Sequence, residues 1–175
     1  MKLNPEQEVY ELIYNDDTYS YYGKSNHGHK ALKAIAELNP ISLLDVGCGH
    51  NKFVQEIRGL GIKAIGVDFA CKSADQIADI LNLPFRDKEF DFITAWDVLE
   101  HLLPNQIEPA LLEMKRVSSR FAFTIAYHYA STPPPKKFKN HNLHQTVKKP
   151  DWWKNQIDNY AEVLQQDEFW IGKWK

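Results

Sequence analysis

The chain alternates short, wholly apolar runs with segments whose apolar residues recur every three or four positions. Apolar runs bounded by glycine, proline or aspartate predict buried strands of a parallel sheet, and the longer period predicts helices packed on it. We expect strands at 41–46, 62–68, 76–81, 90–96, 120–127 and 168–174, and helices at 5–14, 30–38, 51–60 and 110–117 and from Asp151 onward. This order predicts an α/β fold with an open, mostly parallel twisted sheet of six to seven strands and helices on both faces.

Two parts of this sheet are expected to be abbreviated. Ten residues separate Asp68 from Asp79, too few for a crossover helix and a full strand. A single strand-like segment follows the last helix, so the C-terminus is expected to be short as well. We read 1–175 as one domain, with an N-terminal helix and candidate lid (1–29), a core (30–127) and a final loop, helix and strand (128–175).

Composition narrows the classes of protein. The chain is 43% hydrophobic and 25% charged, as expected of a globular domain, and its net charge of −2 lacks the basic excess of a general nucleic-acid binder. Cys48 and Cys71 form neither a disulfide framework nor a CxxC metal pattern. No apolar run approaches the roughly 20 residues needed to cross a bilayer. We therefore expect a cytoplasmic protein with no membrane association.

The segment LLDVGCGHN (43–51) carries the first chemical signal. Gly47 and Gly49 follow a predicted strand and allow a sharp turn that a ligand can approach closely. Asp68 ends the next strand, where a carboxylate can accept hydrogen bonds from both hydroxyls of a ribose. A dinucleotide site would need a glycine at Lys52. Asp45 would repel a pyrophosphate and attract an ammonium or sulfonium group, and S-adenosylmethionine carries both.

At these residues the chain resembles the class I S-adenosylmethionine-dependent methyltransferases, over about 41–127. LLDVGCGHN matches the family's first motif, hhDhGxGxG, except that Asn51 replaces the last glycine, and asparagine tolerates a left-handed backbone. GVDF (66–69), ADILNLPF (78–85) and FDFITAWDVLEHL (90–102) resemble its next motifs. The resemblance implies a Rossmann-like fold, S-adenosyl-L-methionine as cofactor, and a cofactor site formed by Asp45, Gly47, Cys48, Gly49, Asn51, Asp68, Phe69, Asp79, Ile80, Trp96 and Asp97.

Two histidines are candidates for a general base, which an oxygen acceptor would need. His101 lies in DVLEHL and His128 follows the last predicted strand of the core. The alternative for His101 is a packing or helix-capping role. Two roles are also possible for Asp97: it either caps the helix after the fourth strand or faces the site.

The loop and helix after the fifth strand supply candidate substrate contacts. We expect substrate-binding residues here at His141, His144, Trp152 and Trp153, and a fifth at Tyr22 in the candidate lid of the N-terminal segment. For the tryptophans the alternative is core or lid packing, and the five lysines of 136–149 are either a phosphate contact or a solvated face. No carboxylate or cysteine pattern completes a metal site around HNLH (141–144), so no metal is expected.

These features predict methyl transfer to a small-molecule acceptor, for example a sugar or a nucleotide-sugar. A nucleic-acid substrate is not expected, because the fourth strand ends in AWDV rather than a (D/N)PPY motif and neither cysteine is placed for attack on a pyrimidine. Two alternatives remain: a catalytically silent subunit that binds or activates a partner protein, and an aminopropyltransferase, whose glycine motif and acidic channel are absent. The acceptor atom and the oligomeric state do not follow from one sequence.

Overall fold

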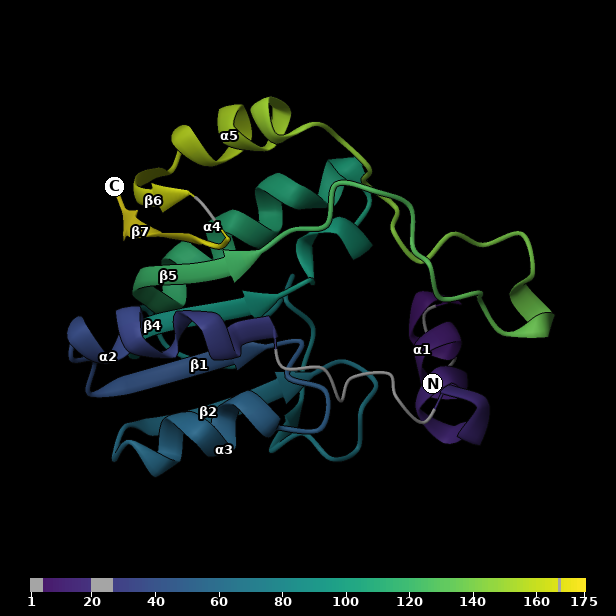
Figure 1. Cartoon of the computed structure of the whole chain (residues 1–175), viewed down its shortest axis with the longest axis horizontal. Helices are drawn as coiled ribbons and strands as arrows, with labels where there is room; N and C mark the ends of the chain where they lie inside the picture. The colour runs from purple at the N-terminus through teal and green to yellow at the C-terminus, as the bar shows by residue number, and fades with distance from the viewer. Residues whose placement is uncertain (1–4, 20–26, 167) are drawn as a thin grey trace.

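The computed structural model describes residues 5–19, 27–166 and 168–175. Its centre is a seven-stranded sheet in the order β3-β2-β1-β4-β5-β7-β6, and Figure 1 shows the labelled strands one above another, from β6 at the top to β2 at the bottom. The strands are β1 (Ser42–Val46), β2 (Lys63–Asp68), β3 (Gln76–Ile77), β4 (Phe90–Trp96), β5 (Ser118–Thr124), β6 (Ala161–Gln166) and β7 (Trp170–Trp174). Neighbours from β3 to β5 pair in parallel, whereas β7 runs antiparallel to both β5 and β6. The predicted open, mostly parallel α/β sheet is confirmed.

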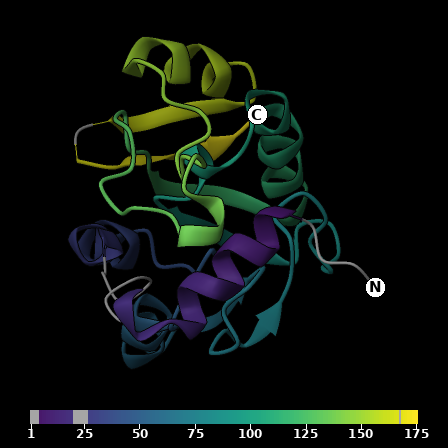
Figure 2. The same ribbon diagram turned by 90° about the vertical axis from the view of Figure 1, so that its right-hand side faces the viewer.

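Helices cover the two faces of the sheet and its carboxyl edge. α2 (Leu32–Glu37) and α3 (Lys52–Gly59) pack on one face, α4 (Ile107–Val117) and α5 (Pro150–Asp158) pack on the other, and α1 (Pro5–Asn15) lies beyond the strand ends (Figures 1 and 2). The helix predicted over 110–117 is confirmed as α4, which begins three residues earlier, and its buried residues are Ile107, Ala110, Leu111, Met114 and Val117. Their spacing puts them on one stripe, which explains why this helix was predictable.

The connection from β2 to β3 contains no helix, as the short spacing predicted. β3 pairs with β2 over two residues and stops at Ile77, so the strand predicted over 76–81 is shorter than expected. Beyond it the Asp79 carboxylate accepts the N–H of Leu81 at 2.9 Å. That local bond gives the backbone an alternative to the ladder.

The C-terminus is not abbreviated, which corrects the expectation. α5 ends at Asp158, and β6 and β7 form an antiparallel hairpin that completes the sheet. Sequence analysis missed β6 because AEVLQQ is an edge strand in which Glu162 and Leu164 are exposed, so it lacks the apolar run of a buried strand. The chain after β4 also differs: where the resemblance implied a helix after the fourth strand, the structure has a short 3₁₀ turn, η3 (Leu99–His101).

Four further 3₁₀ turns lie in the described part of the chain: η1 (Asp17–Tyr19), η2 (His27–Ala31), η4 (Pro104–Gln106) and η5 (Lys136–Phe138). In the described residues, the helices are all too short or too polar to traverse a bilayer.

The carboxyl ends of the parallel strands are covered by α1 and by the segment 125–149 that follows β5. Figure 1 shows both beyond the arrowheads of β1, β2, β4 and β5, and Figure 2 shows α1 lying across that end. Val9 and Ile13 of α1 pack with Ala70 and Leu143 in a separate apolar cluster. This cluster closes over the edge where open α/β sheets bind ligands.

Candidate functional site

A cavity of about 1020 Å³ lies under this cover. Its wall combines the turn after β1, the end of β2, the segment after β3, the end of β4 with η3, and the segment after β5, with α1 above them. Small-molecule sites usually occupy roughly 300–1,000 Å³, so this cavity is at the upper end of that range. It can hold a nucleoside-sized cofactor and a small second molecule together.

The glycine turn adopts the backbone that its sequence requires. Gly47, Gly49 and Asn51 have φ angles of +68°, +51° and +59°, in the left-handed region that glycine and asparagine tolerate best. At Gly47 a Cβ atom would lie 2.4 Å from a methyl group of Val98. The expectation that Asn51 preserves the turn is therefore confirmed at the level of backbone geometry.

Asp68 is buried at the end of β2 and organises the turn. Its Oδ1 accepts the N–H groups of Ala70 and Cys71 at 2.9 and 2.8 Å. Its Oδ2 accepts the N–H of Gly49 at 3.1 Å and the hydroxyl of Tyr14 at 3.2 Å. Two carboxylate oxygens offer about four lone-pair sites, so a ribose that binds here must exchange with the Tyr14 hydroxyl.

Most of the predicted cofactor residues line the cavity, but four do not. Those on the wall are Gly47, Asp68, Phe69, Asp79, Ile80, Trp96 and Asp97. Those behind it are Asp45, Cys48, Gly49 and Asn51. The Cys48 thiol lies against the carbonyl of Gly49, and the amide group of Asn51 donates to the carbonyl of Ser73. These two side chains support the turn from beneath.

Asp45 differs most from its predicted role. It is 1% exposed, and its Oδ1 accepts the hydroxyl of Thr94 at 2.6 Å. Burial raises its pKa to about 7, although the Thr94 hydrogen bond opposes this shift. The predicted contact with a cationic ligand needed a carboxylate on the wall, and this carboxyl group lies behind it.

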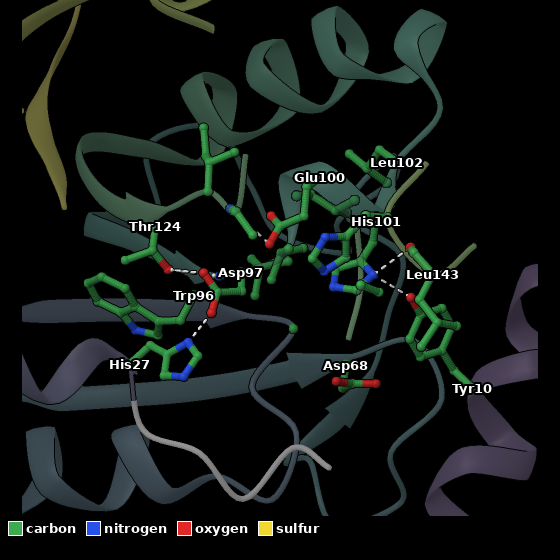
Figure 3. A pocket seen from close by; sticks show the side chains of 18 of the residues that line it. Tyr10, His27, Asp68, Trp96, Asp97, Glu100, His101, Leu102, Thr124 and Leu143 are labelled. Atoms are coloured by element: carbon green, nitrogen blue, oxygen red, sulfur yellow. Dashed lines mark hydrogen bonds and ion pairs between the residues drawn. The ribbon is translucent and has the colours of Figure 1, made fainter. Parts of the chain in front are cut away.

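Asp97 faces the site and caps no helix. Its Oδ1 accepts the Thr124 hydroxyl at 2.7 Å, and its N–H donates to the same hydroxyl oxygen at 2.9 Å. The ring of His27 contacts the other carboxylate oxygen (Figure 3). Val98 occupies the position before η3 and no side chain caps that turn. Asp97 therefore ties β4, β5 and η2 together at the mouth of the cavity.

Three histidines line the opposite part of the wall: His101, His128 and His144. In each of them Nδ1 points to a backbone carbonyl oxygen. Nδ1 of His101 lies 2.8 Å from the carbonyl of Leu143, and Nδ1 of His128 lies 2.9 Å from the carbonyl of Tyr129. Nδ1 of His144 lies 2.5 Å from the carbonyl of His128. A carbonyl can only accept, so Nδ1 carries the proton and Nε2 keeps its lone pair. Burial and the neighbouring His144 lower the pKa of His101 to about 3, and burial also lowers the pKa of His144.

Glu100 is a residue of this wall that sequence analysis missed. Its side chain is fully buried, and burial raises its pKa to about 8. Oε1 accepts the N–H of Ala126 at 3.1 Å, whereas Oε2 has no partner among the described residues. Figure 3 shows Glu100 and His101 side by side at the cavity. In the sequence, a glutamate in DVLEHL looks like an ordinary exposed helix residue, so no pattern pointed to it.

Tyr10 and Tyr14 of α1 also line the cavity and were not predicted. Their spacing of four residues puts them on one face of the helix. The Tyr10 hydroxyl lies 2.5 Å from Nδ1 of His101, as Figure 3 shows. A helical tyrosine pair at this spacing was the available signal. The candidate lid was predicted in the loop after this helix, around Tyr22, and residues 20–26 of that loop lie outside the described part of the chain.

Three of the predicted substrate residues that the structure describes, His141, Trp152 and Trp153, do not reach the cavity. Trp153 is fully buried in the cluster beneath α4 and α5, and Trp152 packs against that cluster, so the packing alternative is correct for both. Nε2 of His141 lies 3.1 Å from a carboxylate oxygen of Glu6, outside the cavity wall. Tyr22 lies outside the described residues. Of the four predicted substrate contacts that the structure describes, His144 is the one on the wall.

Comparison with known proteins gives one family match. Residues 24–155 match the family described as methyltransferase domain. Among relatives, the chain is 26% identical over 147 residues to a probable tRNA methyltransferase 9B of Mus musculus, which covers 79% of this chain and 33% of that protein. The chain spans about a third or less of the length of the relatives of this name.

Two solved structures have the same fold. The PH0226 protein of Pyrococcus horikoshii OT3 superposes with a TM-score of 0.71 at 14% identity, covering 99% of this chain and all of the other. The 1,6-didemethyltoxoflavin-N1-methyltransferase of Burkholderia thailandensis, solved with its substrate and S-adenosylhomocysteine bound, gives a TM-score of 0.64 at 16% identity over 100% of this chain and 92% of the other. The relatives named for tRNA leave the expectation of no nucleic-acid substrate without support.

Proposed function

This chain belongs to the methyltransferase domain family, and we propose that it transfers the methyl group of S-adenosylmethionine to an oxygen of a small polar acceptor, a sugar or a nucleotide-sugar. The family confirms the class that the motifs predicted, a class I S-adenosylmethionine-dependent methyltransferase, and with it the cofactor. The acceptor and the residue roles given below are part of the proposal.

One observation carries the proposal: the cavity is continuous from the glycine turn to the histidine wall. Gly47, Asp68 and Asp79 line one part of it and His101, His128 and His144 another. A cofactor on the first part would point its reactive end toward an acceptor on the second. The cover provided by α1 and the segment 125–149 would exclude water from that junction.

The residues on the first part fit S-adenosylmethionine. The turn at Gly47 leaves the backbone open to close approach, because no Cβ projects from it. Asp68 would accept the ribose hydroxyls once the Tyr14 hydroxyl moves away, and Asp79 would accept the adenine amine while Ile80 lies against the ring. Bound S-adenosylmethionine supplies a methyl group that its sulfonium already activates.

The chain's own contribution is positioning and removal of one proton. Nε2 of His128 would take the proton from the acceptor hydroxyl as its oxygen accepts the methyl group that bound S-adenosylmethionine would supply. We assign this role to His128 because it is exposed at the cavity edge, whereas burial lowers the pKa of His101 to about 3, far from the value near 7 that suits a base. Alignment in such a site can supply roughly 7–11 kcal/mol.

Calorimetric titration with S-adenosylmethionine tests the cofactor half of the proposal. Asp79→Ala should weaken binding by roughly 1–3 kcal/mol, because the adenine amine loses a hydrogen bond to a charged acceptor. Asp158→Ala is the matched control: this acid lies on α5, where it pairs with Lys154 on the surface. Equal binding by wild type and Asp79→Ala would mean that the adenine lies elsewhere. Absence of binding by wild type would favour the silent-subunit alternative.

Transfer from S-adenosyl-[methyl-³H]methionine tests the acceptor half. Label should appear in soluble nucleotide-sugars, and His128→Ala should lower turnover by about 100-fold or more with unchanged cofactor affinity. Unchanged turnover would remove His128 from the reaction.

A second candidate acceptor is a nucleotide within tRNA, and the name of the relatives favours it. Against it stand the net charge of −2 and the pairing of Lys137 with Glu8, which neutralises part of the lysine-rich loop. The same labelled cofactor distinguishes the two acceptors when total tRNA lacking modifications is supplied beside the nucleotide-sugars. Label in acid-precipitable RNA would move the assignment to tRNA.

A further inference from the structure

We propose that Glu100, His101 and His144 form a binding site for one divalent transition-metal cation on the cavity wall. One ligand atom from each side chain lies within 4.8 Å of those of the other two. Glu100 and His101 come from η3, and His144 comes from the segment after β5, so the fold brings a carboxylate and two imidazoles together from distant parts of the chain.

The carboxyl group of Glu100 gives the first independent sign of a ligand. The side chain has 0% exposure, and Oε2 has no hydrogen-bond partner among the described residues although it is buried. A buried polar atom without a partner costs free energy of roughly 1–3 kcal/mol. A cation in contact with Oε2 would remove this cost, and Glu100 is itself a cavity-lining residue.

The orientation of the two imidazoles gives the second sign. Nδ1 of His101 and Nδ1 of His144 donate to the carbonyls of Leu143 and His128. A histidine that binds a metal commonly donates its other ring N–H to a carbonyl or carboxylate, which fixes the tautomer and the ring orientation. Both rings are held in this way, with centroids 4.8 Å apart and planes at 90°.

The donor set indicates the class of cation. Two imidazoles and one carboxylate suit Zn²⁺, Fe²⁺, Co²⁺ or Ni²⁺, whereas Mg²⁺ and Ca²⁺ prefer oxygen ligands. Three protein ligands leave coordination positions open, as in catalytic rather than structural zinc sites. All three side chains line the cavity, so an acceptor in the cavity could reach the cation.

The role of the cation rests on the proposed function. It would bind the acceptor's hydroxyl oxygen and lower the pKa of that hydroxyl, which makes the proton easier for His128 to remove. The ring of His128 lies with its centroid 5.8 Å from that of His144, so base and cation would be adjacent. The metal would thereby activate the acceptor hydroxyl directly beside the base.

Metal binding is measured on the untagged full chain after chelator treatment, with Zn²⁺ by calorimetry and Co²⁺ by visible absorption. We expect one Zn²⁺ per chain and a Co²⁺ absorption band in wild type. Glu100→Gln and His144→Gln should each weaken Zn²⁺ binding by about 10-fold or more and change the Co²⁺ band. His29→Gln is the control, because this histidine lies on the surface beside Glu56 and should have no effect.

Three results would overturn the site: no Zn²⁺ binding and no Co²⁺ band in wild type, equal effects of His29→Gln and His144→Gln, or Mg²⁺ binding as tight as Zn²⁺. If Glu100→Gln fails to fold, as judged by circular dichroism, the half-buried His144 on its loop still provides the test. S-adenosylmethionine affinity is titrated in the same metal-free samples. Cofactor binding without metal binding refutes the metal site alone, and metal binding without cofactor binding refutes the proposed function alone.

Discussion

Replacement of Asp45 by asparagine should stabilise the protein, and by an amount that depends on pH. Asp45 is fully enclosed in β1, and burial raises its pKa from the ordinary 3.8 to about 7. Folding near neutral pH therefore requires this carboxyl group to take up a proton or to remain charged without solvent. Asparagine has the same shape and never ionises, and its side-chain oxygen can still accept the Thr94 hydroxyl.

The direction and the size of this stability change follow from the linkage between proton binding at Asp45 and folding. Between pH 3.8 and about 7 the folded state holds a proton on Asp45 that the unfolded state has released, so rising pH destabilises the wild type. Each pH unit lowers the free energy of unfolding by about 1.4 kcal/mol, and the total loss reaches roughly 4 kcal/mol above pH 7. The gain from Asp45→Asn should therefore grow by on the order of 3 kcal/mol between pH 4.5 and pH 8 and stay constant at higher pH.

Urea unfolding followed by circular dichroism at these two pH values measures the effect. The unfolding midpoint of Asp45→Asn should exceed that of wild type by roughly 1–2 M urea at pH 8 and by much less at pH 4.5. Asp158→Asn, a surface change of the same chemistry, should give no such trend. A difference that is the same at both pH values would mean that Asp45 is ionised in the folded protein and that its burial has been misjudged.

Three further variants test the site. Gly47→Ala should lower both thermal stability and cofactor affinity, because a left-handed alanine costs about 1–2 kcal/mol and its Cβ would displace Val98; wild-type values would refute the role of the turn. Tyr14→Phe should leave S-adenosylmethionine affinity unchanged or raise it by up to about tenfold, since Asp68 is freed for the ribose, and weaker titration would contradict this. Trp153→Ala should lower the free energy of unfolding by roughly 3–5 kcal/mol without changing the KM for the acceptor. A changed KM would indicate that Trp153 contacts the substrate after all.

Structural features that depend only on neighbouring residues in the sequence could be predicted. The turn at Gly47 and Asn51 was predictable because left-handed backbone geometry is a property of single residues. α4 and the buried strands were predictable because periodicity reports which face is covered. The absence of a helix between β2 and β3 could be predicted from the small number of residues in that connection. β6 was missed because an edge strand has one exposed side and no distinctive apolar pattern.

The sequence by itself determined the class of fold, the methyltransferase family and the edge of the sheet on which the candidate site lies, since each depends on short motifs and their order. The tertiary structure alone decided which of those residues reach the cavity. Asp45 belongs to a recognisable motif yet lies behind the wall, whereas Glu100 belongs to no motif and lies on it. The orientation and burial of a side chain depend on segments far away in the sequence: the segment around His144 folds back over η3 and encloses Glu100. That long-range packing turns an ordinary glutamate and two histidines into a candidate metal site.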